Sequence, residues 1–341
     1  MARILVSEKN YIDELATNQE RNLKVVCERL FLSFYEESKN YEMATRIAWK
    51  LQDEPHLLCE MLQQGAVELL FELWDGSEEE MDMDPYLNEL QQLRYLGFVS
   101  LEEELLSVNL EAKDIFYFSL KSRKTKEAMI RYTEWEQVIF GMLFYYGILD
   151  VHTCHGIFCR AMDEEIPYKT LEQFLMIRIV FWRSGLLLRN QQDMHLFMAS
   201  REVMNRNVVF DQWNEWKDLQ FKEYRLEEYK NLAMGNGIIG WDGIPELFQF
   251  ILEEVEDDRY QAMLLVKSIV LMIQNGESYL EVVLQFAKML PEEDADYEKT
   301  ASQYLKRIFY SVPIYGQKGY SREELARQKE GVFHVIDGGK H

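Results

Sequence analysis

Four residues that can bind soft metals or transfer protons lie close together between His152 and Cys159. On a helix, the side chains of His152, His155 and Cys159 share one face, because they are spaced three and four residues apart. Zinc takes imidazole and thiolate ligands in tetrahedral geometry, so these three are the chain's candidate metal ligands. Structural zinc sites usually join two separated ligand pairs, and the sequence offers no second pair. Ordinary helix packing is therefore the favoured interpretation, and we expect no bound metal or cofactor.

A second segment has the spaced glycines of a dinucleotide-binding loop, at residues 235–240 (Gly-Asn-Gly-Ile-Ile-Gly). Such a loop needs a strand before it and a helix directly after it, so that backbone amides meet the pyrophosphate. Here residues 226–234 predict a helix, and residues 241–245 (Trp-Asp-Gly-Ile-Pro) delay the next one. The run therefore indicates a turn between domains. The sequence has neither a nucleophile elbow nor a calcium loop, and we expect no enzymatic activity.

The segment between Tyr132 and Arg201 contains polar side chains that could contact DNA or a protein. It predicts three helices and then a two-stranded hairpin, which is the element order of a winged helix. In winged helices that bind DNA, the third helix enters the major groove and the wing touches the backbone. The candidate contact residues, for nucleic acid or for a partner protein, are Lys169, Gln173, Arg178, Arg183 and Arg189.

Local signals place the helices and strands of this module. Residues 133–136 form a capping box that should start the first helix, and the basic stretch 121–131 before it predicts a solvated linker. Asp150 is placed to cap the second helix. Pro167 opens the third, which we expect to end at 184–185. Two runs between 186 and 198 predict the hairpin.

The whole chain predicts a mainly α, multi-helical fold with a central winged-helix-like module, a small β-hairpin wing and a C-terminal helical bundle. Its N-terminal region is also a candidate degenerate winged helix, because 98–101 predicts a strand and alternation over 116–120 predicts a partner strand. The expected segments are an N-terminal helical region (1–125), the winged-helix-like module (126–205), an aromatic-rich connector (206–243) and the C-terminal bundle with its tail (244–341).

Composition restricts the classes of function. The chain has 341 residues, of which 48% are hydrophobic and 13% aromatic, so it folds into domains with real cores. A net charge of −22 repels phosphate and argues against a dedicated binder of polyanions. The four cysteines form no disulfide framework. The longest uncharged apolar stretch, 138–149, is too short to span a bilayer. We therefore expect a cytoplasmic protein without a membrane partner.

Several short stretches resemble a family of uncharacterised Firmicutes proteins that often end in a SEC-C zinc motif. These stretches are Tyr145-Tyr146-Gly147-Ile148-Leu149, Asp218 to Tyr224, Ile273 to Glu277 and Ile314 to Leu325. The resemblance covers most of the chain from about residue 130 onward. The family's cysteine-rich terminal motif is missing, because no cysteine follows Cys159. The resemblance thus implies an architecture but neither a zinc site nor an activity.

Three hypotheses about function follow. The first is a non-enzymatic interaction or regulatory protein that binds an unidentified protein partner. Its docking surface would be the winged module or the tryptophans Trp213, Trp216 and Trp241 of the connector. The alternative is a DNA-binding transcriptional regulator that uses the winged module. The third, a metal-binding protein or enzyme, would use the histidines and cysteine of 152–159.

Overall fold

The chain forms two compact units that are interleaved along the sequence. The computed structural model describes residues 2–7, 9–35, 37–76, 80–102, 104–181, 185–189, 195–233, 237–290 and 296–328. The N-terminal unit comprises Met1–Glu136 and Lys169–Arg183, and the C-terminal unit comprises Gln137–Tyr168 and Ser184–His341. The four expected segments do not coincide with these units, because the third helix of the predicted module groups with the N-terminal unit.

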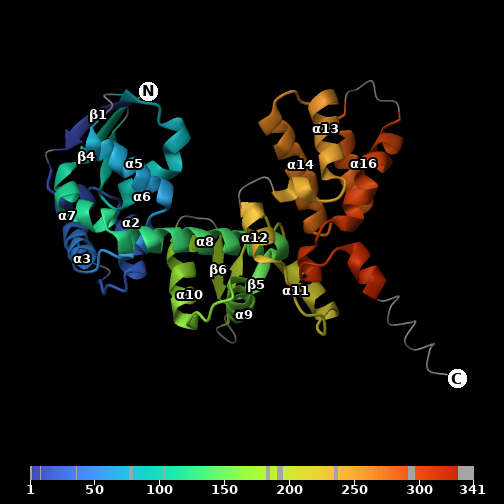
Figure 1. Cartoon of the computed structure of the whole chain (residues 1–341), viewed down its shortest axis with the longest axis horizontal. Helices are drawn as coiled ribbons and strands as arrows, with labels where there is room; N and C mark the ends of the chain where they lie inside the picture. Colours follow the sequence, from blue (N-terminus) through green and yellow to red (C-terminus); the bar gives the residue numbers. More distant parts are fainter. Residues whose placement is uncertain are drawn as a thin grey trace. The chain divides into compact units, whose positions relative to one another are not determined.

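The N-terminal unit packs helices around a small mixed sheet (Figure 1). Its helices are α1 (Tyr11–Ala16), α2 (Glu20–Arg29), α3 (Asn40–Asp53), α4 (Leu57–Met61), α5 (Gln64–Asp75), α6 (Leu87–Tyr95), α7 (Leu110–Lys121), the first part of α8 (Arg123–Tyr146), α10 (Tyr168–Phe174) and the 3₁₀ turn η1 (Asp84–Tyr86). Its strands are β1 (Ala2–Ser7), β2 (Glu80–Met81), β3 (Val99–Glu102) and β4 (Leu105–Asn109), in the order β2-β1-β4-β3. β1 runs parallel to β4, and β3 and β4 are antiparallel neighbours.

The expected strand at 116–120 is a helix in the structure. Asn109 caps α7 by accepting a hydrogen bond from the backbone of Ala112. Phe116 and Leu120 then lie one helical turn apart and are both buried, whereas Phe118 is exposed. The alternation of large apolar residues fits a strand and a helix equally over so few positions. The Asn109 cap and the burial of Phe116 and Leu120 favour the helix.

Helix α8 begins ten residues before the predicted capping box, at Arg123 rather than at Thr133. The Ser122 hydroxyl accepts a hydrogen bond from the backbone of Thr125, which is the contact of an N-cap. The Thr133 hydroxyl is buried in the middle of the helix without a hydrogen-bond partner. The basic stretch 121–131 is therefore part of a helix instead of a linker, and the predicted capping box does not form.

The C-terminal unit contains a three-stranded antiparallel sheet and a bundle of helices (Figure 1). Its elements are the second part of α8, β5 (Ile148–Asp150), α9 (Val151–Met162), β6 (Leu186–Arg189), β7 (Leu196–Ala199), α11 (Arg206–Glu215), α12 (Leu226–Ala233), η3 (Gly237–Gly240), α13 (Ile244–Glu254), α14 (Arg259–Gln274), α15 (Tyr279–Ala287), α16 (Tyr297–Ser311) and η4 (Tyr315–Gln317). The strand order is β5-β7-β6.

Several elements of this unit agree with the expectations from local caps and hydrophobic periods. Asp150 caps α9 by accepting from the backbones of His152 and Thr153. The hairpin β6–β7 is present, although its turn at 190–194 and the end of the third helix at 182–184 lie outside the described residues. The four C-terminal helices also occur, and Gly276 adopts a positive φ of 87° where α14 ends.

The mainly helical fold with a small β-hairpin is thus confirmed. The order α8, β5, α9, α10, β6, β7 is the predicted order of a winged helix, but the assignment to that class remains a prediction. Within the described part of the chain, every helix is too short or too polar to cross a membrane.

Candidate functional site

The third helix of the predicted module offers few side chains for a ligand. Lys169 is exposed, and Arg189 is exposed on β6. Gln173 is half-buried and donates from its Nε2 to Oε2 of Glu60 at 2.8 Å. Arg178 is completely buried, and Arg183 lies outside the described residues. The structure therefore contradicts a surface contact through Arg178 and leaves an intramolecular role for Gln173.

Arg178 forms an ion pair inside the N-terminal unit. Its Nε lies 3.3 Å from Oε2 of Glu136, and its Nη1 donates to the carbonyl oxygen of Leu62. Neither Nε nor Nη2 has a hydrogen-bond partner, so the pair attracts by charge without a well-aligned hydrogen bond. Breaking a buried pair of this kind is costly, because one charge is left unpaired in a medium of low polarity.

Carboxyl groups near Arg178 respond to the same burial. Burial raises the pKa of Glu136, and the charge of Arg178 and a hydrogen bond from Gln63 oppose the rise. Burial likewise raises the pKa of Glu60, which accepts hydrogen bonds from Gln173 and Tyr132. Shifted carboxyl pKa values mark candidate functional groups. Here donors of the protein itself hydrogen-bond to the carboxyl groups of Glu60 and Glu136, so both groups hold the segment that carries Gln173 and Arg178 in place.

The segment that carries Arg178 has an unusual backbone. After α10 the chain continues as a π-helix, η2 (Leu175–Phe181). π-helical turns are rare and often occur at functional sites. Phe174, at the end of α10, packs against the rings of Tyr132 and Trp135, with centroids 5.6 and 5.4 Å away. The segment is thus anchored in the N-terminal unit by aromatic packing on one side and the buried ion pair on the other.

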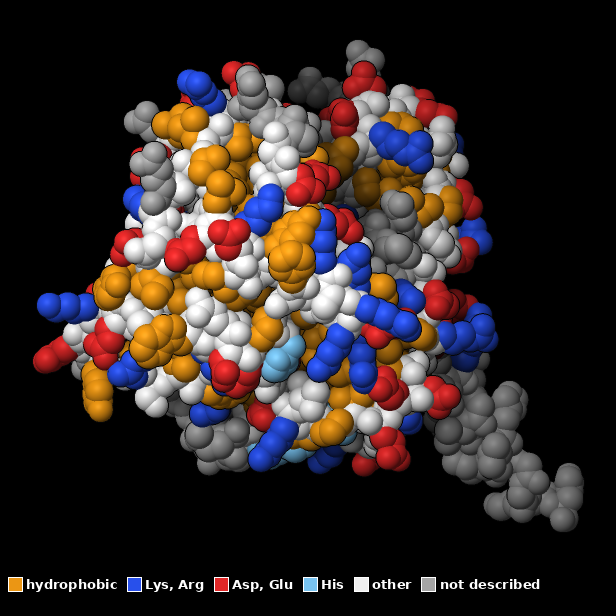
Figure 2. Space-filling view, turned by 60° about the vertical axis from the view of Figure 1, so that its left-hand side comes forward, with side chains coloured by type: hydrophobic (Ala, Val, Ile, Leu, Met, Phe, Trp, Pro, Cys, Tyr) orange, Lys and Arg blue, Asp and Glu red, His pale blue; other side chains and the backbone are white. Residues whose placement is uncertain are grey.

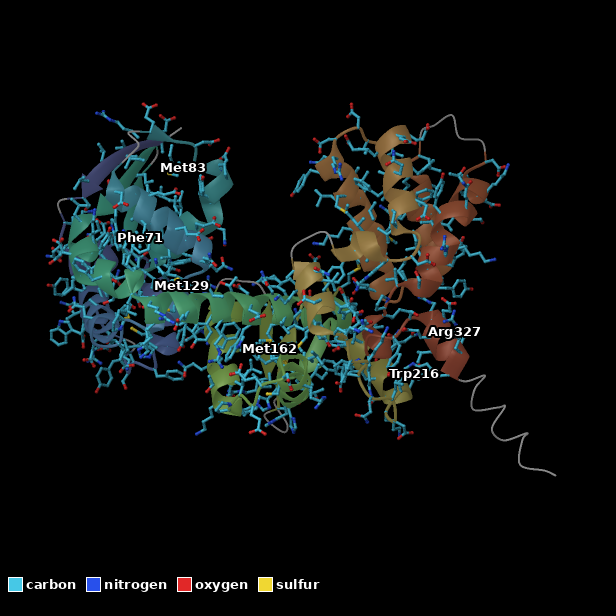
Figure 3. The ribbon with its side chains drawn as sticks, viewed as in Figure 1. Phe71, Met83, Met129, Met162, Trp216 and Arg327 are labelled. Atoms are coloured by element: carbon cyan, nitrogen blue, oxygen red, sulfur yellow. The ribbon has the colours of Figure 1, made fainter. Side chains whose placement is uncertain are left out.

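The connector tryptophans do not form an exposed patch. Trp213, Trp216 and Trp241 are all half-buried, and Figure 3 labels Trp216. The indole nitrogen of Trp213 donates to the carbonyl oxygen of Tyr315 at 3.2 Å. The ring of Trp241 lies 5.8 Å from that of Tyr145. These residues mainly hold the connector in the C-terminal unit, which weakens the connector as a docking surface.

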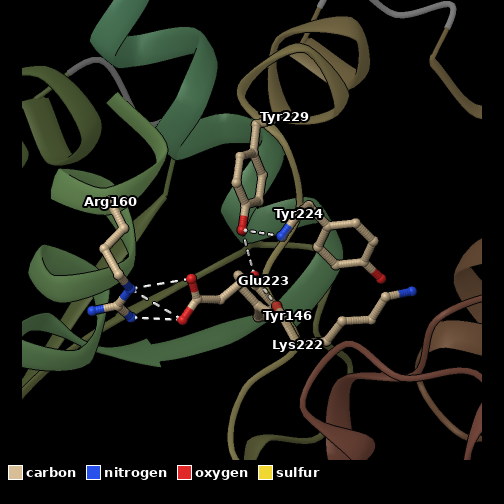
Figure 4. Close-up of polar contacts among 6 residues, drawn as sticks. All are labelled: Tyr146, Arg160, Lys222, Glu223, Tyr224 and Tyr229. Atoms are coloured by element: carbon tan, nitrogen blue, oxygen red, sulfur yellow. Dashed lines mark hydrogen bonds and ion pairs between the residues drawn. The ribbon is translucent and has the colours of Figure 1, made fainter. Parts of the chain in front are cut away.

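A cluster of tyrosines forms a hydrogen-bonded arrangement in the C-terminal unit (Figure 4). The hydroxyl of Tyr229 donates to that of Tyr146 at 2.6 Å and accepts from the backbone nitrogen of Tyr224 at 3.2 Å. The Tyr146 hydroxyl in turn donates to the carbonyl oxygen of Lys222. Burial raises the pKa of Tyr229 to about 12 and raises those of Tyr146 and Tyr224 as well. The phenols therefore stay neutral and act as structural hydrogen-bonding groups.

The four stretches that resemble the SEC-C-associated family meet around this cluster. The rings of Tyr145 and Tyr224 stack with centroids 3.6 Å apart. Gln274 donates to the carbonyl oxygen of Phe144 at 2.8 Å, and Tyr315 donates to Gln274 at 3.3 Å. Residues that are distant in sequence therefore share one packing arrangement, and their motifs have a structural explanation.

The histidines and cysteines of α9 are engaged with their neighbours. His152 is exposed and stacks on Tyr168, with centroids 4.3 Å apart. Nε2 of His155 lies 2.6 Å from the carbonyl oxygen of Ile166, and because a carbonyl only accepts, Nε2 carries the proton. Sγ of Cys159 lies 3.5 Å from the same Nε2. Among the described residues, no three His, Cys, Asp or Glu side chains are arranged to hold a metal ion.

The residues that sequence reasoning missed lie on the polar side of α3. Met43, Ile47 and Leu51 bury one face of this helix, and Tyr41 and Trp49 lie on the opposite face with exposures of 56% and 65%. Aromatic residues at helical spacing outside the buried face were the available signal.

Comparisons with known proteins identify no relative. No family model matches the chain, no curated protein matches it, and no solved structure matches it. The resemblance to the SEC-C-associated family therefore remains a prediction.

Proposed function

We propose that this protein is a non-enzymatic interaction protein that acts through contacts with another protein. The observation that carries this proposal is an aromatic surface on the N-terminal unit, made of Phe31, Tyr35, Tyr41 and Trp49. Their side chains are 67%, 76%, 56% and 65% exposed. Trp and Tyr dominate the energetics of protein interfaces, so four exposed aromatic residues in one region favour a partner.

Contacts within the N-terminal unit hold this aromatic surface in a defined conformation. Tyr41 and Trp49 lie two helical turns apart on α3. Arg46, between them, donates to the carbonyl oxygen of Ser33 and so fixes the loop before α3 against the helix. Phe31, in that loop, has a positive φ of 54°. For a bulky residue this backbone conformation is strained, and the fold maintains it while the ring remains exposed.

The test uses one aromatic residue on this surface and one elsewhere. Cross-linking and mass spectrometry would first identify the partner, and titration would then give its affinity for each variant. We expect Trp49→Ala to weaken binding by about ten-fold or more. Tyr260→Ala is the control, because Tyr260 is equally exposed at 69% but lies on α14. Equal affinity of the wild type and Trp49→Ala would contradict the proposal.

The alternative, a DNA-binding regulator, rests on Arg189, an exposed candidate contact on β6 of the C-terminal unit. A labelled mixed-sequence duplex should be titrated with the protein over a salt series. Phosphate contacts predict affinity that falls steeply as salt rises and falls again in Arg189→Glu. No binding at low salt removes this alternative.

A further inference from the structure

A mostly apolar cavity lies on the N-terminal unit between α5, α7 and α8. Its volume is about 330 Å³, at the lower end of the ~300–1,000 Å³ typical of ligand sites. The apolar lining consists of Val67, Phe71, Leu120, Met129 and Ile130. Figure 3 labels Phe71 on α5 and Met129 on α8. Ile130 is 63% exposed, so the apolar lining continues to the surface. The space suits one bulky apolar side chain.

Two lysines line this cavity. They are Lys121 and Lys126, and the Lys121 Nζ lies 5.2 Å from the ring centroid of Phe71. Nζ of Lys121 donates a hydrogen bond to the hydroxyl oxygen of Tyr117, and this bond raises the pKa of Lys121, so the lysine stays protonated. Figure 2 shows hydrophobic side chains and Lys or Arg side chains next to one another on the molecular surface.

The two lysines that line the cavity have no ion-pair partner among the described residues. Residues 121–131 contain five Lys or Arg residues and one acidic residue, Glu127. Glu127 already forms an ion pair with Arg123 at 2.7 Å. The two cavity lysines, Lys121 and Lys126, are exposed. Glu68 also lines the cavity and accepts from Gln64, so the rim has one acidic position.

We propose that this cavity binds a bulky apolar side chain of an acidic peptide segment from another protein, while carboxylates of that segment pair with Lys121 and Lys126, the two lysines that line the cavity. Apolar anchors in pockets supply most interface energy, and complementary charge supplies orientation and specificity. Met129 suits such a lining because methionine adapts its shape to different anchors. The inference rests on the proposed function, but its residues differ from those of the aromatic surface.

The net charge of the protein restricts the class of anion. A long polyanion extends over much of the surface and is repelled by the net charge of −22. A short acidic segment stays within about 8–10 Å of the local cations, which is the distance over which salt screens charge. An acidic peptide with an apolar anchor is therefore favoured over nucleic acid at this place.

The test measures fluorescence anisotropy of a labelled acidic peptide against the full chain. The peptide is an amphipathic helix with leucines at i, i+3, i+4 and i+7 and glutamates elsewhere. Two further peptides replace the leucines by alanine or the glutamates by lysine. We expect saturable binding of the first peptide only. Lys121→Glu with Lys126→Glu should weaken that binding about ten-fold or more.

A control double variant with the same change in net charge separates the local effect of the two lysines from the effect of the protein's net charge. Lys299 and Lys306 are exposed on α16, and reversing both alters the net charge equally. This control should bind as the wild type does. Equal weakening in both double variants, or no binding of the leucine–glutamate peptide, would overturn the inference.

Two competitors address other ligands. Decanoate that binds while the peptide does not would assign the cavity to a small amphiphile. An oligonucleotide that binds with equal sensitivity to Lys121→Glu with Lys126→Glu would assign the lysines to a nucleic-acid site. Either result overturns the inference. Trp49→Ala, which tests the aromatic surface, should leave peptide binding unchanged, so the failure of one site is distinguishable from the failure of the other.

Discussion

The two units use different kinds of buried polar group to hold their packed segments together: a charged side chain in the N-terminal unit and neutral hydroxyls in the C-terminal unit. In the N-terminal unit, the charged side chain of Arg178 is completely buried, and two of its nitrogens have no hydrogen-bond partner. In the C-terminal unit, the neutral hydroxyls of Tyr146 and Tyr229 hydrogen-bond to each other and to the backbone. A buried charge needs its counter-charge, whereas a neutral hydroxyl needs only donors and acceptors. The first arrangement is therefore more sensitive to the loss of one partner.

The largest expected effect is on the buried ion pair. Glu136→Ala leaves Arg178 without its counter-charge and should lower the free energy of unfolding of the N-terminal unit by about 3–5 kcal/mol. Urea denaturation followed by tryptophan fluorescence measures it. The double variant Glu136→Leu with Arg178→Met removes both charges and should retain most of the stability. An equal loss in the single and double variants would show that the charge is not the cause.

A smaller effect is expected where a glycine permits close packing in the C-terminal unit. Gly147 has a φ of +67°, and an added Cβ would lie 2.5 Å from Cγ of Tyr315. Gly147→Ala should therefore destabilise the protein by about 2–4 kcal/mol, seen as a lower Tm. Gly76→Ala is the control, because Gly76 has a similar φ of +65° and no described atom within 4 Å of the new Cβ. It should lose only about 1 kcal/mol to backbone strain.

Loss of one hydroxyl from the tyrosine cluster should destabilise the protein less than Glu136→Ala or Gly147→Ala. Tyr229→Phe removes the hydroxyl that contacts Tyr146 and the backbone of Tyr224, and the expected loss is about 1–2 kcal/mol. Chemical denaturation measures this loss in the same way. Tyr260→Phe alters an exposed ring and should change nothing measurable. A loss for Tyr229→Phe as large as that for Glu136→Ala would contradict the proposed difference between the units.

The smallest effect is a dependence on pH. Burial raises the pKa of Glu60 in the folded state. The stabilising contribution of its neutral form is therefore complete below the pKa of the unfolded chain and is lost as pH rises through the folded-state pKa. Glu60→Gln is neutral at every pH, so its stability relative to the wild type should increase from about pH 4 to pH 7. Denaturation curves at several pH values test this, and a relative stability that falls with pH would show the opposite sign.

The sequence predicted those elements whose signals lie within a few residues of each other. Asp150 and the helix after it, the hairpin strands and the four C-terminal helices were all expected and occur. Their caps and periods depend on neighbours three or four positions away. The same local reasoning failed for Thr133, because a capping box is only a preference and the earlier cap at Ser122 starts the helix first.

The candidate site could be predicted less well, because it depends on contacts between distant residues. Arg178 has the same local pattern whether it faces solvent or a protein core. Its burial follows from Glu136 and Leu62, which belong to other helices or loops. The aromatic surface was visible in part, because Tyr41 and Trp49 fall opposite the buried face of α3. The apolar cavity was not visible, since its lining comes from three separate helices.

The sequence by itself determined the mainly helical class, the net charge of −22 and the positions of most helices, because composition and short-range spacing are sufficient for these. Only the tertiary structure decided that the third helix of the predicted module belongs with the N-terminal unit. It also decided that the basic stretch 121–131 continues a helix beside an apolar cavity. The physical reason is that burial and charge pairing are set by long-range packing, which no local pattern specifies.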